Sequence, residues 1–462
     1  MNRTSIWLAA VALAAALPLA GSAQDGTLDL GFFDDGVRTY GFDLDPDETD
    51  RGAALASQPD GKLLMAGSAC GTADACHAGV IRMLENGNLD VPFSGGGVHF
   101  PYANGTVNGV TSILVRPNDG GIVVVGMTQP DKIGLAALDA LGDLNPAFGD
   151  TINSPGTILH ALAGGTLFQV NAALLQSDRR ILVAGQGRQT GFTDLDFFVA
   201  RFTEAGQYDG SYNTDGVAWV HFDLGGANQD ALDGMALQAD GKVVVGGNVD
   251  VAADDEDTGF ARFTTTGALD PTFDGDSGTG NGKFVWDAPD DVGLGEELLR
   301  DMTVQPDGRI LFVGSYYPNA VGANTAVFFG RLLTSGATDP ALDVRIPDLM
   351  AAYDSEVAHY IVLQSDKKFV VGFEPIGGSR CGAARFDANG NSLDSGFGTA
   401  GVVSFSNFGN HAYCVDGILW AGKLTVVGQA QLNPSDVDFI GFRFNSALIF
   451  TDGFESGSTA QW

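Results

Sequence analysis

The stretch Leu237-Gln-Ala-Asp-Gly-Lys-Val-Val-Val-Gly-Gly247 decides the fold of this chain. It predicts two antiparallel strands joined by a tight turn, with Asp240-Gly241 at the corner and three valines after Lys242. An Asp-Gly pair before a β-branched run favours a hairpin, because glycine adopts positive φ without steric cost. We therefore expect a β-hairpin here.

The same hairpin recurs along the chain at intervals of 55 to 67 residues. Aligned on the residue four before the lysine, the copies begin at Gln58, Arg116, Gln176, Gln238, Gln305, Gln364 and, in degenerate form, Leu419. After each hairpin comes an apolar strand that carries an arginine in every copy but one, where Ala137 stands: Arg82, Arg201, Arg262, Arg331, Arg385 and Arg443.

A third motif has the form Leu-Asp-x-x-Phe and precedes a short apolar strand; we call it the LD turn. Its copies begin at Leu28, Leu89, Leu144, Tyr208, Leu269, Thr338 and Leu393. Each unit thus holds about four short strands, and no window has sustained helical periodicity. Four-stranded units at a fixed period are typical of propeller blades. The sequence predicts an all-β fold, a seven-bladed β-propeller with four antiparallel strands per blade.

The order of the motifs predicts how the ring closes. The first LD turn, Leu28 to Phe32, precedes the first hairpin, and the last arginine strand, residues 438–444, has no LD turn after it. In a closed ring this first turn lies beside that last strand and supplies what it lacks. Closure protects the ends of a repeat array, which would otherwise need polar capping units.

In combination, LDxxFG, QxDGK before an apolar run, and an ARF strand at a period near sixty resemble the delta-60 repeat family. The resemblance covers roughly residues 26 to 445. It implies tandem repeats of an exported bacterial protein that form a β-propeller, and it implies no established catalytic residues.

The two ends of the chain lie outside the repeats. Residues 1–23 have a basic residue, an apolar run and a Gly-Ser-Ala end, which predicts a signal peptide and an exported protein that is periplasmic, on the cell surface or extracellular. Residues 24–445 form the predicted propeller. Residues 446–462 resemble the GFESG-type C-terminal tail of exported Gram-negative proteins. This tail is either a sorting or anchoring signal or an end that adds an edge strand.

Composition restricts the partners. The chain has 57 acidic and 24 Lys or Arg residues, a net charge of −33, which argues against nucleic acid and anionic membrane. No later apolar run is long enough to span a membrane. We expect a monomer whose partner is a protein or a glycan. Four cysteines in an oxidising compartment predict a local disulfide between Cys70 and Cys76 and a second one between Cys381 and Cys414, although other pairings remain open.

The repeated charged residues have two interpretations. Six arginines in a ring could line a channel and bind anions, or each could do the same structural work in its own repeat. An arginine can hold a carboxylate or turn carbonyls with several hydrogen bonds. The structural role is favoured, because aspartates recur in the hairpins almost as often: Asp60, Asp178, Asp240, Asp307 and Asp366. In the LD turn, the aspartate is expected to form an Asx-turn while the phenylalanine packs between blades.

Two irregular stretches of the fourth unit could bind calcium. These are residues 250–257 (DVAADDED) and 274–281, rich in aspartate and glycine, and hard cations prefer oxygen ligands. The candidate ligands are Asp254, Asp255, Asp257, Asp274 and Asp276. The alternative is a solvated acidic insertion, since Asp274-x-Asp276 lacks the further ligands of an EF-hand.

No motif predicts catalysis. The six histidines form no HExxH pair, and there is no GxSxG elbow. His221 is expected to face a sheet rather than to be a ligand. We expect a non-enzymatic binding or structural module. The alternative is a propeller hydrolase or lyase acting on polysaccharide, assisted by calcium.

Overall fold

The structure is a computed structural model. It describes residues 25–42, 49–71, 76–102, 106–117, 119–252, 255–275, 278, 280–287, 295–318, 324–342, 347, 349–350, 355–376, 380–405, 411–420, 422–433 and 436–445. The predicted signal peptide and the tail at 446–462 lie outside these residues. Within them the chain contains β-strands and two short 3-10 turns, η2 (Ser94–Gly96) and η3 (Pro340–Leu342), and no α-helix, so the predicted all-β class is confirmed. No helix in these ranges could span a membrane.

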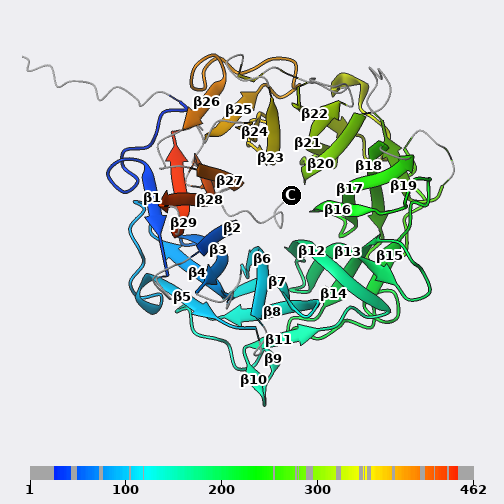
Figure 1. Cartoon of the computed structure of the whole chain (residues 1–462), viewed down its shortest axis with the longest axis horizontal. Helices are drawn as coiled ribbons and strands as arrows, with labels where there is room; N and C mark the ends of the chain where they lie inside the picture. Colours follow the sequence, from blue (N-terminus) through cyan, green and yellow to red (C-terminus); the bar gives the residue numbers. More distant parts are fainter. Residues whose placement is uncertain are drawn as a thin grey trace, which may run out of the picture.

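The strands form antiparallel sheets arranged around a centre (Figure 1). Three of them have four strands from one continuous part of the chain. The first consists of β12 (Gly165–Leu175), β13 (Ile181–Gln189), β14 (Asp196–Phe202) and β15 (Val217–Val220). The second consists of β16 (Ala231–Leu237), β17 (Val243–Ala252), β18 (Asp255–Phe263) and β19 (Lys283–Trp286). The third consists of β23 (Glu356–Leu363), β24 (Phe369–Pro375), β25 (Cys381–Phe386) and β26 (Val402–Phe405).

Two further sheets depart slightly from that pattern. In one, β6 (Thr106–Val115), β7 (Ile122–Gln129) and β8 (Lys132–Leu138) are joined by β11 (Thr157–His160), while β9 (Gly149–Asp150) and β10 (Ser154–Pro155) pair with each other. The other holds β20 (Gly295–Val304), β21 (Ile310–Pro318) and β22 (Ala326–Leu332). The fourth strand expected there falls mostly on residues outside the described ranges.

The chain ends meet in one eight-stranded sheet. It joins β27 (His411–Trp420), β28 (Lys423–Asn433) and β29 (Asp436–Phe444) to β2 (Thr49–Ser57), β3 (Leu63–Cys70), β4 (Cys76–Met83) and β5 (Gly97–Phe100), and β1 (Val37–Tyr40) pairs with β29. In Figure 1 the blue β1 lies beside the red β29. Leu28 bridges to Phe444, and Asp29 Oδ2 accepts a hydrogen bond from Arg443 Nε at 2.7 Å. The predicted placement of the first LD turn beside the last strand is confirmed.

The valine run of the opening hairpin shows why the sheets stack around a centre. Val243 and Val245 pack with Leu182 of β13, on one side of the sheet, whereas Val244 packs with Phe312 of β21, on the other. Successive residues of a strand point to opposite faces, so an unbroken apolar run needs a neighbouring sheet on each side. The core therefore lies between sheets.

The turn of this hairpin also has the predicted backbone. Gly241 has φ +82°, in the left-handed region that favours glycine. Asp240 Oδ1 accepts a hydrogen bond from the amide of Lys242 at 3.1 Å. We call the strand of each sheet that lies nearest the centre in Figure 1 its inner strand. The inner strand β16 is bulged between Leu232 and Gly234, a feature that increases local twist.

Candidate functional site

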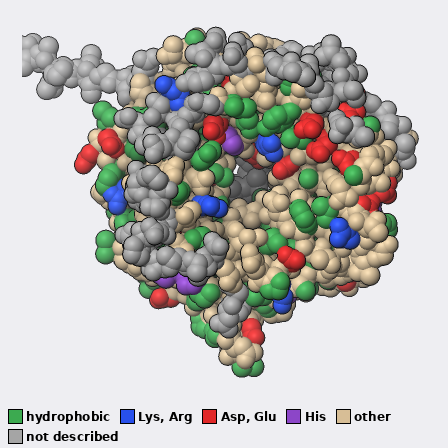
Figure 2. Space-filling model, in the orientation of Figure 1, with side chains coloured by type: hydrophobic (Ala, Val, Ile, Leu, Met, Phe, Trp, Pro, Cys, Tyr) green, Lys and Arg blue, Asp and Glu red, His purple; other side chains and the backbone are tan. Residues whose placement is uncertain are grey.

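The strand ends lie on two faces of the ring that differ in chemistry. Hairpins and LD turns lie on one face. The end of the arginine strand links them, since Phe263 pairs with Val243 beside the hairpin turn and bridges to Leu269 of the LD turn. We call this face the motif face. The opposite face, which we call the loop face, carries connections that differ between repeats, such as the one between β17 and β18. Figure 2 views the loop face and shows acidic side chains gathered over β17 to β20.

The repeated arginines lie on the motif face and are at most 6% exposed. Arg262 Nε donates to Asp270 of the LD turn at 2.8 Å, and its Nη1 donates to the carbonyl of Thr334 in the next sheet at 2.5 Å. Equivalent carboxylate contacts are Arg82–Asp90, Arg201–Asp209, Arg331–Asp339, Arg385–Asp394 and Arg443–Asp29. Each arginine thus holds its own LD turn, and several also hold the neighbouring sheet.

The implied pairing of these arginines with the hairpin aspartates was wrong. Asp60, Asp178, Asp240, Asp307 and Asp366 instead each accept a hydrogen bond from the amide two residues later. They also approach the basic side chain at that position, as Asp240 does with Lys242 at 3.4 Å. The hairpin turns the aspartate outward, and Asp240 remains 55% exposed. The buried arginines therefore take the carboxylate of the LD turn.

The last residue of the LD turn packs on the next repeat, and it is a phenylalanine except in two copies, which have Tyr212 and Leu342. A side chain at Gly142, which has φ +89°, would lie 3.0 Å from the ring of Phe93. The guanidinium of Arg82 lies over the same Phe93 ring, 4.4 Å from its centre. A cation over an aromatic face is attracted by the ring quadrupole. Arginine, phenylalanine and turn glycine therefore form one contact between neighbouring sheets.

Electrostatics support these contacts. Burial alone would raise the pKa of Asp209, but hydrogen bonds from Ser211 and the charges of Arg201 and Arg180 lower it to about 2. Asp209 is thus ionised at neutral pH and remains paired with Arg201. The repeated arginines of the motif face are committed to protein carboxylates.

The one repeat without the arginine compensates for its loss. Ala137 replaces the arginine and Asn145 replaces the LD aspartate, so neither charge is buried alone. Arg116 takes the place of the hairpin glutamine, and its Nη2 donates to the carbonyl of Glu204 at 2.9 Å. A guanidinium therefore reaches the neighbouring sheet from a different strand.

The last hairpin requires a correction to the alignment. Trp420, rather than Leu419, takes the position of the repeated glutamine. Its Nε1 donates to the carbonyl of Gly61 at 3.2 Å, as Gln58 Nε2 does to Gly120 at 3.3 Å. Because this turn is one residue shorter than the others, counting back from Lys423 misplaces the equivalent residue by one.

Both predicted disulfides are present. Cys70 pairs with Cys76 within the β3–β4 connection, and Cys381 of β25 pairs with Cys414 of β27. The second disulfide joins neighbouring sheets, as expected.

The structure separates the predicted calcium ligands. Asp254 and Asp276 lie outside the described residues. Asp257 lies at the loop-face end of β18, whereas Asp274 follows the LD turn at the motif-face end, where its amide donates to Ser335. Six residues of strand separate Asp257 from Phe263, a distance of about 20 Å. One site built from both stretches is therefore wrong, and Asp255 belongs to the Asp257 end alone.

Asp257 instead meets two carboxylates that sequence reasoning missed. Ligand atoms of Asp257, Asp287 and Glu297 all lie within 4.8 Å of one another, where β18, β19 and β20 end on the loop face. Oxygen ligands of this kind could hold a hard cation such as calcium. The spacing of these residues along the chain offers no sequence signal, since they come from three strands.

The preceding repeat has different residues at the same three positions. Asp196, like Asp257, stands five residues before the repeated arginine, and His221 and Asp230 correspond to Asp287 and Glu297. His221 Nδ1 lies 2.8 Å from Asp196 Oδ2, and Asp196 is 1% exposed. The close carboxylate of Asp196 raises the pKa of His221. The imidazole stacks on the exposed ring of Phe192 at 4.4 Å.

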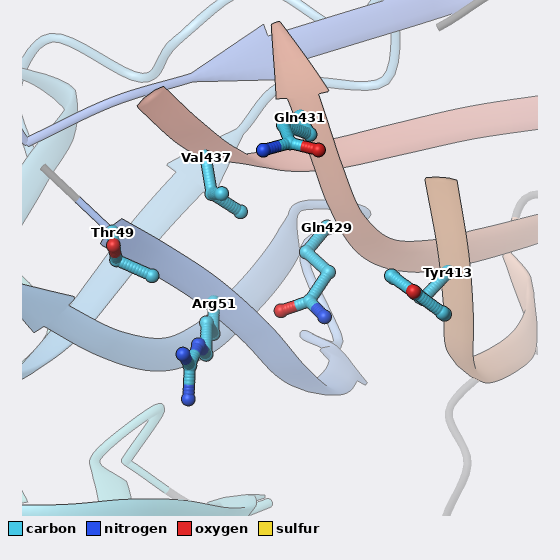
Figure 3. A pocket seen from close by; sticks show the side chains of 6 residues that line it. All are labelled: Thr49, Arg51, Tyr413, Gln429, Gln431 and Val437. Carbon is cyan, nitrogen blue, oxygen red and sulfur yellow. The ribbon is translucent and has the colours of Figure 1, made fainter. Parts of the chain in front are cut away.

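A pocket opens where the first and last inner strands meet. It measures about 240 Å³ and is lined by Thr49, Arg51, Tyr413, Gln429, Gln431 and Val437. In Figure 3, Gln429 lies between Arg51 and Tyr413. Arg51 is exposed and forms no ion pair with any carboxylate in the part of the chain that the structure describes. We call this the seam pocket.

Comparison with known proteins supports the fold. Residues 238–273 and 305–341 match a family described as a domain of unknown function (DUF5122) beta-propeller. Each match runs from a hairpin glutamine to an LD turn, which is the repeat unit inferred from the motifs. The fold is a β-propeller. No curated protein matches this sequence.

Several solved structures are similar to this propeller. Polysaccharide lyase Uly1 aligns with a TM-score of 0.48 and 12% identity over 88% of this chain and 91% of its own. A PL25 ulvan lyase, determined with -[GlcA(1-4)Rha3S]-, aligns with a TM-score of 0.46 and 11% identity over 87% and 95%. Neither likeness is close enough to carry an activity over to this chain.

Proposed function

We propose that this protein is an exported, seven-bladed β-propeller of the delta-60 repeat kind that acts as a binding module for an acidic saccharide outside the cytoplasm. Support for seven blades comes from dividing the eight-stranded sheet where β29 meets β2, since these strands share only one parallel pair, Thr49 with Val437. Residues 1–23 would be the signal peptide and 24–445 the propeller. Two disulfides suit an oxidising compartment.

The observation that carries the binding function is the seam pocket on Arg51. Its lining combines one guanidinium, two side-chain amides, a hydroxyl and a phenol ring. Amides and hydroxyls can hydrogen-bond sugar hydroxyls, and a guanidinium binds a carboxylate through two parallel hydrogen bonds. A pocket of about 240 Å³ suits a single sugar unit more than a large ligand. A uronic acid residue combines these features.

The different surroundings of the arginines support binding of the saccharide carboxylate at Arg51. On the motif face the repeated arginines are buried and paired with carboxylates. Arg51 is exposed and has no such pair among the described residues. A ligand carboxylate could therefore bind Arg51 without displacing a protein contact.

Calorimetric titration of the mature protein with uronate-containing and neutral oligosaccharides tests the proposal. We expect binding of the acidic ligands only, and Arg51→Gln to weaken it about 10-fold to 100-fold, because a hydrogen bond to a charged group contributes about 1.5–3 kcal/mol. Arg188→Gln, which removes another exposed arginine, is the matched control. Equal affinities for Arg51→Gln and the unchanged protein would exclude the seam pocket.

A second candidate function is a hydrolase or lyase acting on polysaccharide. The observation that favours it is His221, whose Nδ1 contacts the buried carboxylate of Asp196. A carboxylate that orients an imidazole is an arrangement used for general acid–base catalysis. Incubating the protein with acidic polysaccharides, with and without a chelator, distinguishes the two functions. Product formation that His221→Gln abolishes would establish the enzyme and contradict the purely binding role.

The role of residues 446–462 is proposed separately. We propose that this GFESG-type tail sorts or anchors the exported protein. Deleting it and measuring the protein in the culture medium and the cell fraction tests this. An unchanged distribution would remove the sorting role.

A further inference from the structure

Two histidines that are distant in sequence meet on the loop face. His77 lies on β4 and His99 on β5, and Gly79 is the register partner of His99. His77 is two residues from Gly79, so both side chains project from the same side of the sheet in a diagonal cross-strand pair. Their Nδ1 atoms are 3.0 Å apart, and their ring planes differ by 18°. Figure 2 shows histidine exposed over this part of the loop face.

The surrounding contacts hold both rings without a ligand. Phe42 meets the ring of His99 edge-on at 6.1 Å between centroids. On the other side, His77 follows Cys76, which is joined to Cys70 by a disulfide. Buried Asp50 accepts hydrogen bonds from the amides of both Phe42 and Cys70. The carboxylate thus links the two segments that position the histidines.

The distance between the two Nδ1 atoms suits a shared cation. At 3.0 Å one Nδ1 can share a proton with the other, and a metal ion can replace that proton. Two nitrogens bound to one metal at 2.0–2.1 Å, with an angle of 90–110°, are separated by about 2.8–3.4 Å. The observed 3.0 Å falls within this range.

We propose that His77 and His99 form a binding site for a divalent transition metal such as Zn²⁺, Cu²⁺ or Ni²⁺, with water completing the coordination. Imidazole nitrogen favours these ions over Ca²⁺ and Mg²⁺, which prefer oxygen. The net charge of −33 raises the local concentration of cations. This site is separate from the seam pocket and does not depend on the proposed saccharide binding.

The test is a titration of the metal-free mature protein with Cu²⁺ or Zn²⁺ alone at pH 7.5. We expect one site that an excess of Ca²⁺ does not block. His77→Gln and His99→Gln should each weaken it at least about tenfold, the lower end of the loss caused by removing an outer-shell partner of a metal. His359→Gln, a half-buried histidine beside Glu374 at 3.5 Å, is the matched control.

Two further measurements make the result specific. Affinity should fall when the pH is lowered from 7.5 to 5.5, because protonated imidazole cannot bind a metal. With Cu²⁺, electron paramagnetic resonance should report nitrogen ligands that disappear in the His77→Gln/His99→Gln double variant. The proposal is overturned if the folded double variant binds Cu²⁺ and Zn²⁺ as tightly as the unchanged protein, or if the unchanged protein binds neither.

Discussion

Arg262 illustrates how single residues hold the repeats together. Its guanidinium contacts the LD carboxylate of its own repeat, the side chain of Gln238 and a carbonyl of the next sheet. Each of these partners is polar and would lose a buried donor if the arginine were removed, and Asp270 would keep Lys242 at 3.0 Å as its remaining cation. In the repeat where Ala137 replaces this arginine, Asn145 replaces the LD aspartate, so no carboxylate there has to be paired.

We predict that Arg262→Leu destabilises the protein by about 3 kcal/mol, because Asp270 loses its buried cation and keeps only the half-buried Lys242, while Gln238 and Thr334 lose a donor. Asp240→Ala, which removes the exposed hairpin aspartate, should cost about 1 kcal/mol or less. Urea unfolding followed by fluorescence measures both. Equal losses would contradict the assignment of the LD aspartate, rather than the hairpin aspartate, as the arginine's partner.

At the scale of elements, buried and half-buried acids connect neighbouring inner strands. Asp301 of β20 accepts the amide of Ile361 of β23 at 2.8 Å, and Asp416 of β27 accepts the amide of Leu55 of β2 at 3.0 Å. Desolvation and the charge of Asp416 raise the pKa of Asp301 to about 7, although the amides of Ile361 and Met302 lower it. The folded state therefore holds the proton of Asp301 more tightly than the unfolded chain does.

This shift predicts a pH dependence that Asp301→Asn should reduce. A carboxyl with a raised folded pKa stabilises the fold fully below its unfolded pKa of about 3.9, and this contribution is lost as the pH rises to about 7. An asparagine oxygen can still accept the Ile361 amide but does not titrate. Thermal unfolding from pH 4.5 to 8 should show the variant gaining stability relative to the unchanged protein as pH rises. Parallel curves would contradict the prediction.

The two disulfides should contribute unequally, because they close loops of different length. Cys381–Cys414 spans 33 residues and Cys70–Cys76 spans 6. The chain-entropy relation gives about 4 and about 2 kcal/mol respectively. Replacing each pair by two alanines and comparing urea midpoints measures this difference. A larger loss from the Cys70–Cys76 pair would show that loop entropy does not dominate.

At the scale of the whole molecule, the N-terminal segment packs on the last strands of the chain. β2 also contacts β27, so the first and last repeats lie side by side. Residues 28–40 add β1, the Leu28 bridge and the Asp29–Arg443 ion pair to the last strand. Phe32 is fully buried there and meets Trp420.

We predict that starting the chain at residue 41 destabilises it by several kcal/mol, since Arg443 would lose the carboxylate of Asp29 and Trp420 would lose the ring of Phe32 that covers it. Hydrogen exchange should quicken first in β27 to β29. A chain that starts at residue 24 is the control, and Asp29→Asn provides a milder variant that keeps β1. Unchanged exchange in both variants would exclude the closing role.

Local chemistry made much of this molecule predictable. Asp-Gly corners, β-branched runs and LD turns act within a few residues, so the repeat, the hairpins and the all-β class could be read from the chain. Motif order also placed Leu28 to Phe32 beside the last strand, and cysteine positions indicated both disulfides.

Only the tertiary structure decided which side chains meet across strands and sheets. Arg262 could not be assigned to Asp270 rather than Asp240 until the turn geometry placed one carboxylate inside and the other in solvent. Asp257, Asp287 and Glu297, the pair His77 and His99, and the seam pocket around Arg51 are formed by sheet register and ring closure. Those depend on contacts between distant segments, which no local pattern of residues encodes by itself.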